Sequence, residues 1–177
     1  MNLPNKLSIL RVLCIPVIVS LLYAGNRTCQ LIACVVFIFA ALTDLLDGYI
    51  ARSRNLITDF GKFIDPVADK LLVLTTLIML VHGGLMDAWV VILILCRELA
   101  VDGLRMVAVG QGKVIAAGQL GKWKTTFQMI TIVCILLLNT GCFSAWYTGV
   151  LTGISVILTV VSAVDYFRKN SAVFQTK

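Results

Sequence analysis

Four aspartates recur at helical spacing within an otherwise apolar part of the chain. They form the frame Asp44-x-x-Asp47-Gly48-x-x-Ala51-Arg52, then eight residues, then Gly61-x-x-x-Asp65-x-x-x-Asp69. Side chains three or four residues apart share one face of a helix, so each half of the frame offers two carboxylates to a common point. Ionised aspartate in a hydrocarbon layer costs about 2.5–3.5 kcal/mol, so these side chains need partners or a function. Carboxylate oxygens suit Mg²⁺ or Mn²⁺, and two such helix ends facing each other predict a metal site.

The chemistry that such a site supports is displacement at phosphorus. One or two divalent metals held by four carboxylates can bridge a diphosphate and polarise its oxygens. A carboxylate that is only partly engaged by metal can accept a proton from an attacking hydroxyl. The sequence offers no Ser-His pairing within the apolar stretches and no glycine-rich nucleotide loop, which disfavours acyl and hydride transfer.

The elements that position these residues are membrane helices. The chain has 177 residues, 59% of them hydrophobic, and a mean hydropathy of +0.97. Such values are typical of polytopic membrane proteins, and about 20 apolar residues span a bilayer as a helix. We therefore predict an all-α fold, one membrane domain over residues 1–177 with a six-transmembrane-helix bundle and a short N-terminal interfacial segment. The expected spans are 7–25, 29–51, 64–82, 86–109, 118–139 and 146–167.

Basic residues set the expected orientation. Of the fifteen Lys and Arg residues, all but Arg27 fall on one predicted side of the membrane. The positive-inside rule then places both termini, and the four aspartates, on the cytoplasmic side. The net charge of +6 is confined to this rim, so anionic lipid headgroups explain it better than nucleic acid does.

A second polar stripe is expected on the helix over 86–109 and at the start of the next helix. Its positive charges exceed what its acidic side chains neutralise, which predicts an anionic substrate. An internal ion-pair ladder that only lets the helix sit in the bundle is the alternative. The stripe consists of Arg97, Glu98, Asp102 and Arg105, followed by Lys122 and Lys124.

The N-terminal segment carries a third polar face. Asn5, Ser8 and Arg11 follow one another at steps of three residues. This spacing places them on one side of an interfacial helix, where they can add contacts to a bound nucleotide.

The aspartate frame resembles, at every fixed position, the signature of the CDP-alcohol phosphotransferase family. The resemblance extends over essentially the whole chain. The segments Arg97-Glu98-x6-Arg105 and Gly121-Lys122-x-Lys124-Thr125-Thr126-x-Gln128-Met129 are similar to the bacterial phosphatidylglycerophosphate synthases within that family. The start, Pro4-Asn5-x-Leu7-Ser8-x-x-Arg11, is also similar, with serine where threonine is more usual. Asp102 is less expected in the family, and we leave it out of the predicted site.

The resemblance implies a homodimer of six-helix bundles in the cell membrane, with a metal-dependent site facing the cytoplasm. It implies two Mg²⁺ or Mn²⁺ ions bound by Asp44, Asp47, Asp65 and Asp69, with Asp69 as general base. It assigns the CDP group to Gly48, Ala51 and Arg52, together with Asn5, Ser8 and Arg11. The implied reaction transfers the phosphatidyl group of CDP-diacylglycerol to sn-glycerol 3-phosphate and releases CMP. Candidates for binding the acceptor phosphate are Arg97, Arg105, Lys122 and Lys124.

Two other functions remain open from the sequence. Another acceptor, inositol phosphate above all, would use the same donor site, and only the segments around Arg97 and Lys122 argue against it. An ion-coupled transporter also uses carboxylates within the membrane. The aspartates cluster at one depth, however, and the sequence shows no inverted repeat, which disfavours transport.

Overall fold

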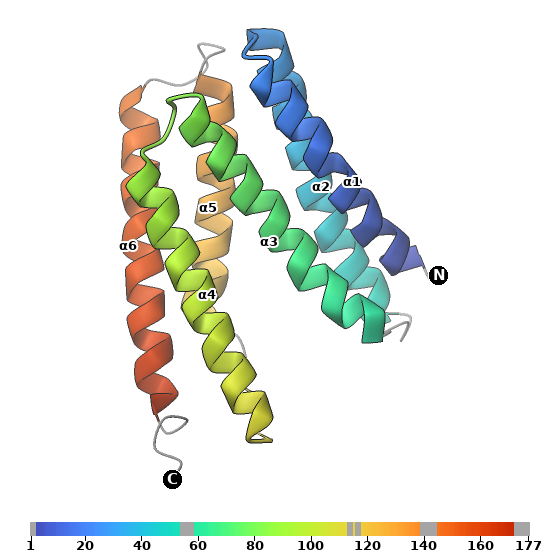
Figure 1. Cartoon of the computed structure of the whole chain (residues 1–177), viewed down its shortest axis with the longest axis vertical. Helices are drawn as coiled ribbons and strands as arrows, with labels where there is room; N and C mark the ends of the chain where they lie inside the picture. The colour runs from blue at the N-terminus through green and yellow to red at the C-terminus, as the bar shows by residue number, and fades with distance from the viewer. Residues whose placement is uncertain (1–2, 54–58, 113–114, 116–117, 139–144, 172–177) are drawn as a thin grey trace. The chain divides into compact units, whose positions relative to one another are not determined.

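The computed structural model describes the chain as six α-helices and short connections. It describes the backbone of residues 3–53, 59–112, 115, 118–138 and 145–171, and the side chains of 7–43, 64–112, 115, 118–137 and 146–171. No strand occurs in these ranges. The helices are α1 (Leu3–Tyr23), α2 (Arg27–Ser53), α3 (Asp59–His82), α4 (Ala88–Gly110), α5 (Gln119–Leu138) and α6 (Ala145–Lys169) (Figure 1).

Each predicted stretch corresponds to one helix, which confirms the all-α prediction. The interfacial segment expected before residue 7 is continuous with α1, because helical backbone already begins at Leu3. Helix α3 ends in a Schellman motif, in which the Leu85 N–H donates to the Leu80 carbonyl (2.9 Å) and the Gly84 N–H to that of Val81 (3.0 Å). Gly84 has φ +67°, a left-handed conformation that glycine adopts without strain.

The first of two compact units comprises Met1–Met86 and Ile132–Phe143. Within it, α1 packs against both α2 and α3 (Figure 1). Fully buried alanines on α2 and α3, Ala33, Ala40 and Ala68, leave room for neighbouring helices to approach closely. The buried hydroxyl of Thr76 donates to the Leu72 carbonyl (2.7 Å), so this polar group is satisfied within its own helix.

The second unit comprises Asp87–Thr131 and Ser144–Lys177. Here α4 and α6 lie side by side (Figure 1). Their shared core contains Val101, Leu104 and Ala108 of α4 with Tyr166 of α6. This packing fixes the second half of α4, which carries the second polar stripe of the sequence.

Two helical segments in the described part, Gln119–Leu137 and Trp146–Lys169, are long and apolar enough to cross a membrane. Leu7–Tyr23 and Arg27–Thr43 form shorter apolar helices. Helices α3 and α4 carry acidic and basic side chains at one end, which shortens their uncharged stretches. The six predicted spans are therefore confirmed as helices, while their crossing of the membrane stays a prediction.

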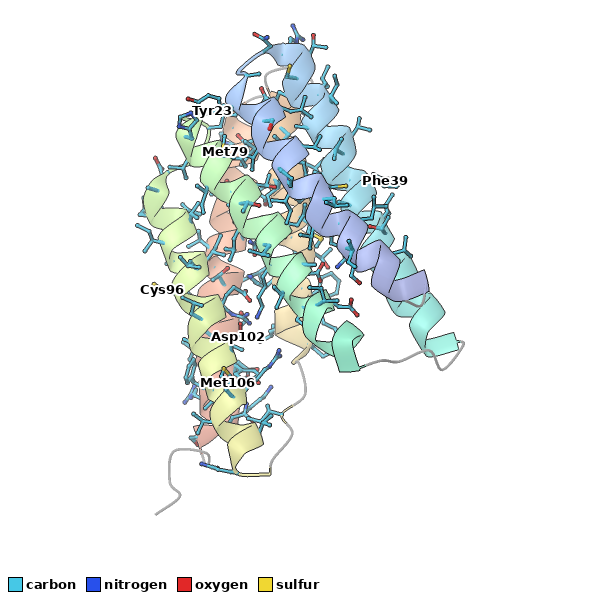
Figure 2. All side chains as sticks on the ribbon, turned by 45° about the vertical axis from the view of Figure 1, so that its right-hand side comes forward. Tyr23, Phe39, Met79, Cys96, Asp102 and Met106 are labelled. Carbon is cyan, nitrogen blue, oxygen red and sulfur yellow. The ribbon has the colours of Figure 1, made fainter. Side chains whose placement is uncertain are left out.

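Two phenylalanines on α2 provide a test of the first unit's packing. Phe37 is fully buried, whereas Phe39, labelled in Figure 2, points away from the helices and is 52% exposed. Phe37→Ala is expected to cost about 3–5 kcal/mol of stability because it leaves a cavity. Thermal melting in detergent measures the effect, with Phe39→Ala as the matched control. Equal melting shifts for the two variants would contradict this packing.

Candidate active site

The described half of the aspartate frame lies on α3 and faces α1. Ser8 Oγ of α1 donates a hydrogen bond to Asp65 Oδ1 of α3. Arg11 Nη1, three residues further along α1, donates to Asp69 Oδ1 at 3.0 Å. Residues three apart on α1 thus contact residues four apart on α3, one hydrogen-bonded pair for each turn of helix. The sequence predicted each of these faces, but not that they contact each other.

The Arg11–Asp69 pair is enclosed on one side only. The Arg11 side chain is 0% exposed, while that of Asp69 is 35% exposed. Ser8 is also fully buried. A buried guanidinium is tolerated only where a carboxylate and further hydrogen bonds compensate the loss of water. Asp69 therefore both pairs with Arg11 and keeps access to solvent, as a residue must if it is to meet a substrate.

The other half of the predicted metal and nucleotide site is on α2. Asp44, Asp47, Gly48, Ala51 and Arg52 lie on its helical backbone, which continues to Ser53, but their side chains lie outside the described residues. The same holds for the Asn5 side chain on α1. Side chains at positions 44 and 47 of a helix share one face.

The two described aspartates, Asp65 and Asp69, could supply part of a binding site for a hard cation. Asp65 and Asp69 supply carboxylate oxygens one helical turn apart, the donor type that Mg²⁺ and Mn²⁺ prefer. Among the described side chains, no cluster of three or more His, Cys, Asp or Glu occurs. A complete metal site would therefore also need carboxylates from Asp44 and Asp47.

A cluster of basic residues lies in the second unit and centres on Glu98. Glu98 Oε1 accepts hydrogen bonds from Arg97 Nη1 (3.1 Å) and from Lys124 Nζ. Lys124 lies near the start of α5 and Glu98 belongs to α4, so this carboxylate links the two helices. Two cationic side chains from two helices thus share this one carboxylate.

The Arg97 guanidinium retains hydrogen-bonding capacity inside this cluster. Its Nε atom is buried and has no hydrogen-bond partner among the described residues. Gly121 lies beside it, because a Cβ atom there would be 3.6 Å from Arg97 Nη2. A buried N–H without a partner is costly, so this donor suits an anionic ligand.

The remaining candidates for phosphate binding differ from each other. Arg105 Nε donates to the Tyr166 hydroxyl at 3.0 Å, and its guanidinium carbon lies 5.5 Å from the centre of the Tyr166 ring. Tyr166 is 6% exposed and thus fixes the arginine against α6. Lys122 is exposed, whereas Lys124 is buried.

Sequence reasoning missed two residues that hydrogen-bond to the candidate phosphate ligands, Glu98 and Tyr166. Glu98 was noted as part of the polar stripe but was not assigned to the site. Tyr166 was not considered, although a tyrosine near the charged end of an apolar helix is a signal that its hydroxyl meets a polar partner. Asp102, left out of the predicted site, lies on α4 near this cluster in sequence (Figure 2).

Comparisons with known proteins show the family of this chain. A family model described as CDP-alcohol phosphatidyltransferase matches residues 1–161. The chain belongs to this family, which confirms the resemblance found in the aspartate frame.

Individual relatives show which enzymes within the family the chain is similar to. The chain is 42% identical to the CDP-diacylglycerol–glycerol-3-phosphate 3-phosphatidyltransferase of Bacillus subtilis, covering 99% of this chain and 98% of the relative. It is 38% identical to the enzyme of the same name from Rickettsia typhi, with 94% and 96% covered. A probable phosphatidylglycerophosphate synthase of Mycobacterium tuberculosis is 38% identical, with 95% and 81% covered. Over nearly its full length, the chain is thus similar to enzymes that share one name or one product.

The bond between Arg105 and Tyr166 gives a prediction for stability. Tyr166→Phe keeps the ring in the core but leaves Arg105 Nε without this acceptor. We expect a loss of about 1.5–3 kcal/mol, the usual range for a hydrogen bond to a charged group. Thermal melting in detergent measures it against Tyr147→Phe, since Tyr147 is exposed. An unchanged melting temperature for Tyr166→Phe would show that water replaces the hydroxyl.

Proposed function

We propose that this protein transfers the phosphatidyl group of CDP-diacylglycerol to sn-glycerol 3-phosphate, giving phosphatidylglycerophosphate and CMP. The observation that carries the proposal is the match along nearly the whole chain to enzymes with this name. The described aspartates on α3 and the basic cluster on α4 and α5 supply chemistry of the required kind. The product is a precursor of phosphatidylglycerol, so the enzyme serves phospholipid biosynthesis.

In this proposal Asp44, Asp47, Asp65 and Asp69 bind two Mg²⁺ or Mn²⁺ ions. Bound metal supplies charge stabilisation to the phosphoryl oxygens. Asp69 accepts the proton of the attacking hydroxyl of the acceptor. Its position at the surface of the enclosed pair with Arg11, with 35% of its side chain exposed, supports this role.

The donor nucleotide is assigned to the α2 part of the frame. Gly48, Ala51 and Arg52 hold the CDP group, with Asn5 from the start of α1. Small residues at positions 48 and 51 allow a bulky ligand to approach the helix backbone. Ser8 and Arg11 were assigned to the same group from the sequence. Their described contacts are to Asp65 and Asp69, so a role in binding CDP stays a prediction for both.

The acceptor phosphate is assigned to the basic cluster. Arg97, Arg105, Lys122 and Lys124 are its proposed ligands. The support comes from the two cations that share the Glu98 carboxylate and from the buried Arg97 N–H without a partner among the described residues. Arginine is well suited to a phosphate because its planar donors engage two oxygens at once.

We further propose a multi-pass protein of the cell membrane, a homodimer with six spans, both termini in the cytoplasm and the active site facing it. Exposed aromatic side chains support this topology: Tyr23 ends α1, Trp89 begins α4, and Trp146 begins α6. All three lie at ends assigned to the outer face, where aromatic residues commonly mark the membrane interface. Exposed apolar side chains such as Leu13, Ile92 and Ile157 fit contact with lipid.

The direct test is CMP release by the purified protein from CDP-diacylglycerol with Mg²⁺. Glycerol 3-phosphate, inositol phosphate and serine are compared as acceptors. Activity with glycerol 3-phosphate alone is the expected result. Activity with inositol phosphate alone would keep the donor half of the site but overturn the acceptor assignment. Absence of CMP release with every acceptor would refute the transferase and favour an ion-coupled transporter.

The proposed base gives the first variant. Asp69→Asn keeps the shape of the side chain but removes its basicity and its charge. CMP release is expected to fall by at least about 100-fold, within the usual range for loss of a general base. Asp87→Asn is the control, since Asp87 is exposed and its side chain makes no capping hydrogen bond. A rate near that of the unaltered enzyme would exclude Asp69 from the chemical step.

The proposed acceptor site gives the second variant. Arg105→Ala is expected to raise KM for glycerol 3-phosphate by about ten-fold or more, since a charged hydrogen bond is worth about 1.5–3 kcal/mol. KM for the lipid donor should change less. Steady-state kinetics with each substrate varied in turn measures both values, with Arg168→Ala, an exposed arginine, as control. Equal losses for the two substrates would instead indicate that Arg105 only joins α4 to α6.

A further inference from the structure

Arg11 is the most enclosed charged residue among the described side chains. It heads the fully buried side chains by volume, with 0% of its surface exposed. Removing an ammonium-sized or guanidinium-sized charge from water costs several kcal/mol, which only a close opposite charge and hydrogen bonds offset. Asp69 supplies that charge at 3.0 Å.

This ion pair lies within the proposed metal site. Asp69 belongs to the four carboxylates proposed to bind metal, and its neighbour on the same face of α3, Asp65, accepts the Ser8 hydroxyl. Two residues one turn apart on α1 thus hold two carboxylates one turn apart on α3. The Asp65 and Asp69 carboxylates would repel each other without cations, and one fixed guanidinium reduces that repulsion.

We propose that Arg11 is a built-in counter-cation of the aspartate site, a positioning residue that holds Asp69 in place when metal is absent. The inference rests on the proposed metal site. A cation that stabilises the metal-free site also repels a divalent cation bound to the same carboxylates. By reciprocity, the coupling that lowers metal affinity is the same coupling that stabilises the metal-free protein.

This role differs from binding the CDP group. An enclosed guanidinium bonded to Asp69 acts on the site through that carboxylate. Asp69 therefore keeps its position when metal is absent. The cost is weaker metal binding than four unaccompanied carboxylates would give.

The test compares melting temperatures in EDTA and in Mg²⁺ for the unaltered protein and for Arg11→Met, both purified in detergent. Arg11→Met should melt at least about 3 °C lower in EDTA, because Asp69 loses its charged partner while its partly exposed carboxylate regains only some water. The rise in melting temperature on adding Mg²⁺ should be larger in the variant. Direct Mn²⁺ titration should show at least about five-fold tighter binding to the variant. Arg27→Met, the loss of an exposed arginine in the same unit, is the matched control and should change neither value.

Each other outcome decides the question as well. Equal Mg²⁺-induced shifts in the two proteins would overturn the proposal and leave Arg11 as a structural ion pair alone. A variant that can be purified only with Mg²⁺ present would support it, because metal then replaces the missing positive charge. A variant that fails to fold even with Mg²⁺ would overturn it. CMP release by the unaltered protein tests the proposed function separately, so an active enzyme with equal shifts refutes this inference alone.

Discussion

The structure depends on one constraint: a charge that is enclosed among apolar helices needs an opposite charge close by. The ion pair between the buried Arg11 and Asp69 is the clearest case. Helices with apolar surfaces carry charges near one end, and the enclosed charges Arg11 and Lys124 each contact a carboxylate. Arg11 of α1 contacts Asp69 of α3, and Glu98 of α4 contacts Lys124 of α5 as well as its own neighbour Arg97. These contacts fix the relative position of α1 and α3, and of α4 and α5, at the ends where chemistry is proposed. Elsewhere in these helices, hydroxyl groups such as that of Thr76 are satisfied by the carbonyl one turn earlier.

The helices could be predicted almost completely from the sequence. Each expected stretch corresponds to one helix, and the limits differ by only a few residues, because long apolar runs bounded by glycine and polar residues leave few alternatives. The largest difference is at α3, which begins at Asp59 rather than near residue 64. A hydropathy pattern does not predict the extra turn, residues 59–63, because some of these residues are polar.

The site was predictable in its residue types and only partly in its contacts. Spacing indicated that Asp65 and Asp69 share a face, and that Ser8 and Arg11 share another. It could not indicate that these faces meet, because pairing between helices depends on packing by residues such as Ala68 that carry no chemical signal. The role of Glu98 was similarly hidden, since one carboxylate among several bases does not show which of them it will bind. Tyr166 lies some sixty positions from Arg105, and only the packing of α6 on α4 joins them.

The bond between Arg105 and Tyr166 has a consequence for biosynthesis of the chain. Arg105 is synthesised with α4, but the tyrosine that fixes it belongs to α6. Until α6 has been synthesised and has packed, the arginine has neither its hydrogen-bond acceptor nor the aromatic ring beneath it. The position of Arg105 is therefore fixed only late in synthesis. A chain stalled before residue 166 would carry every aspartate of the frame while Arg105 still lacked both contacts.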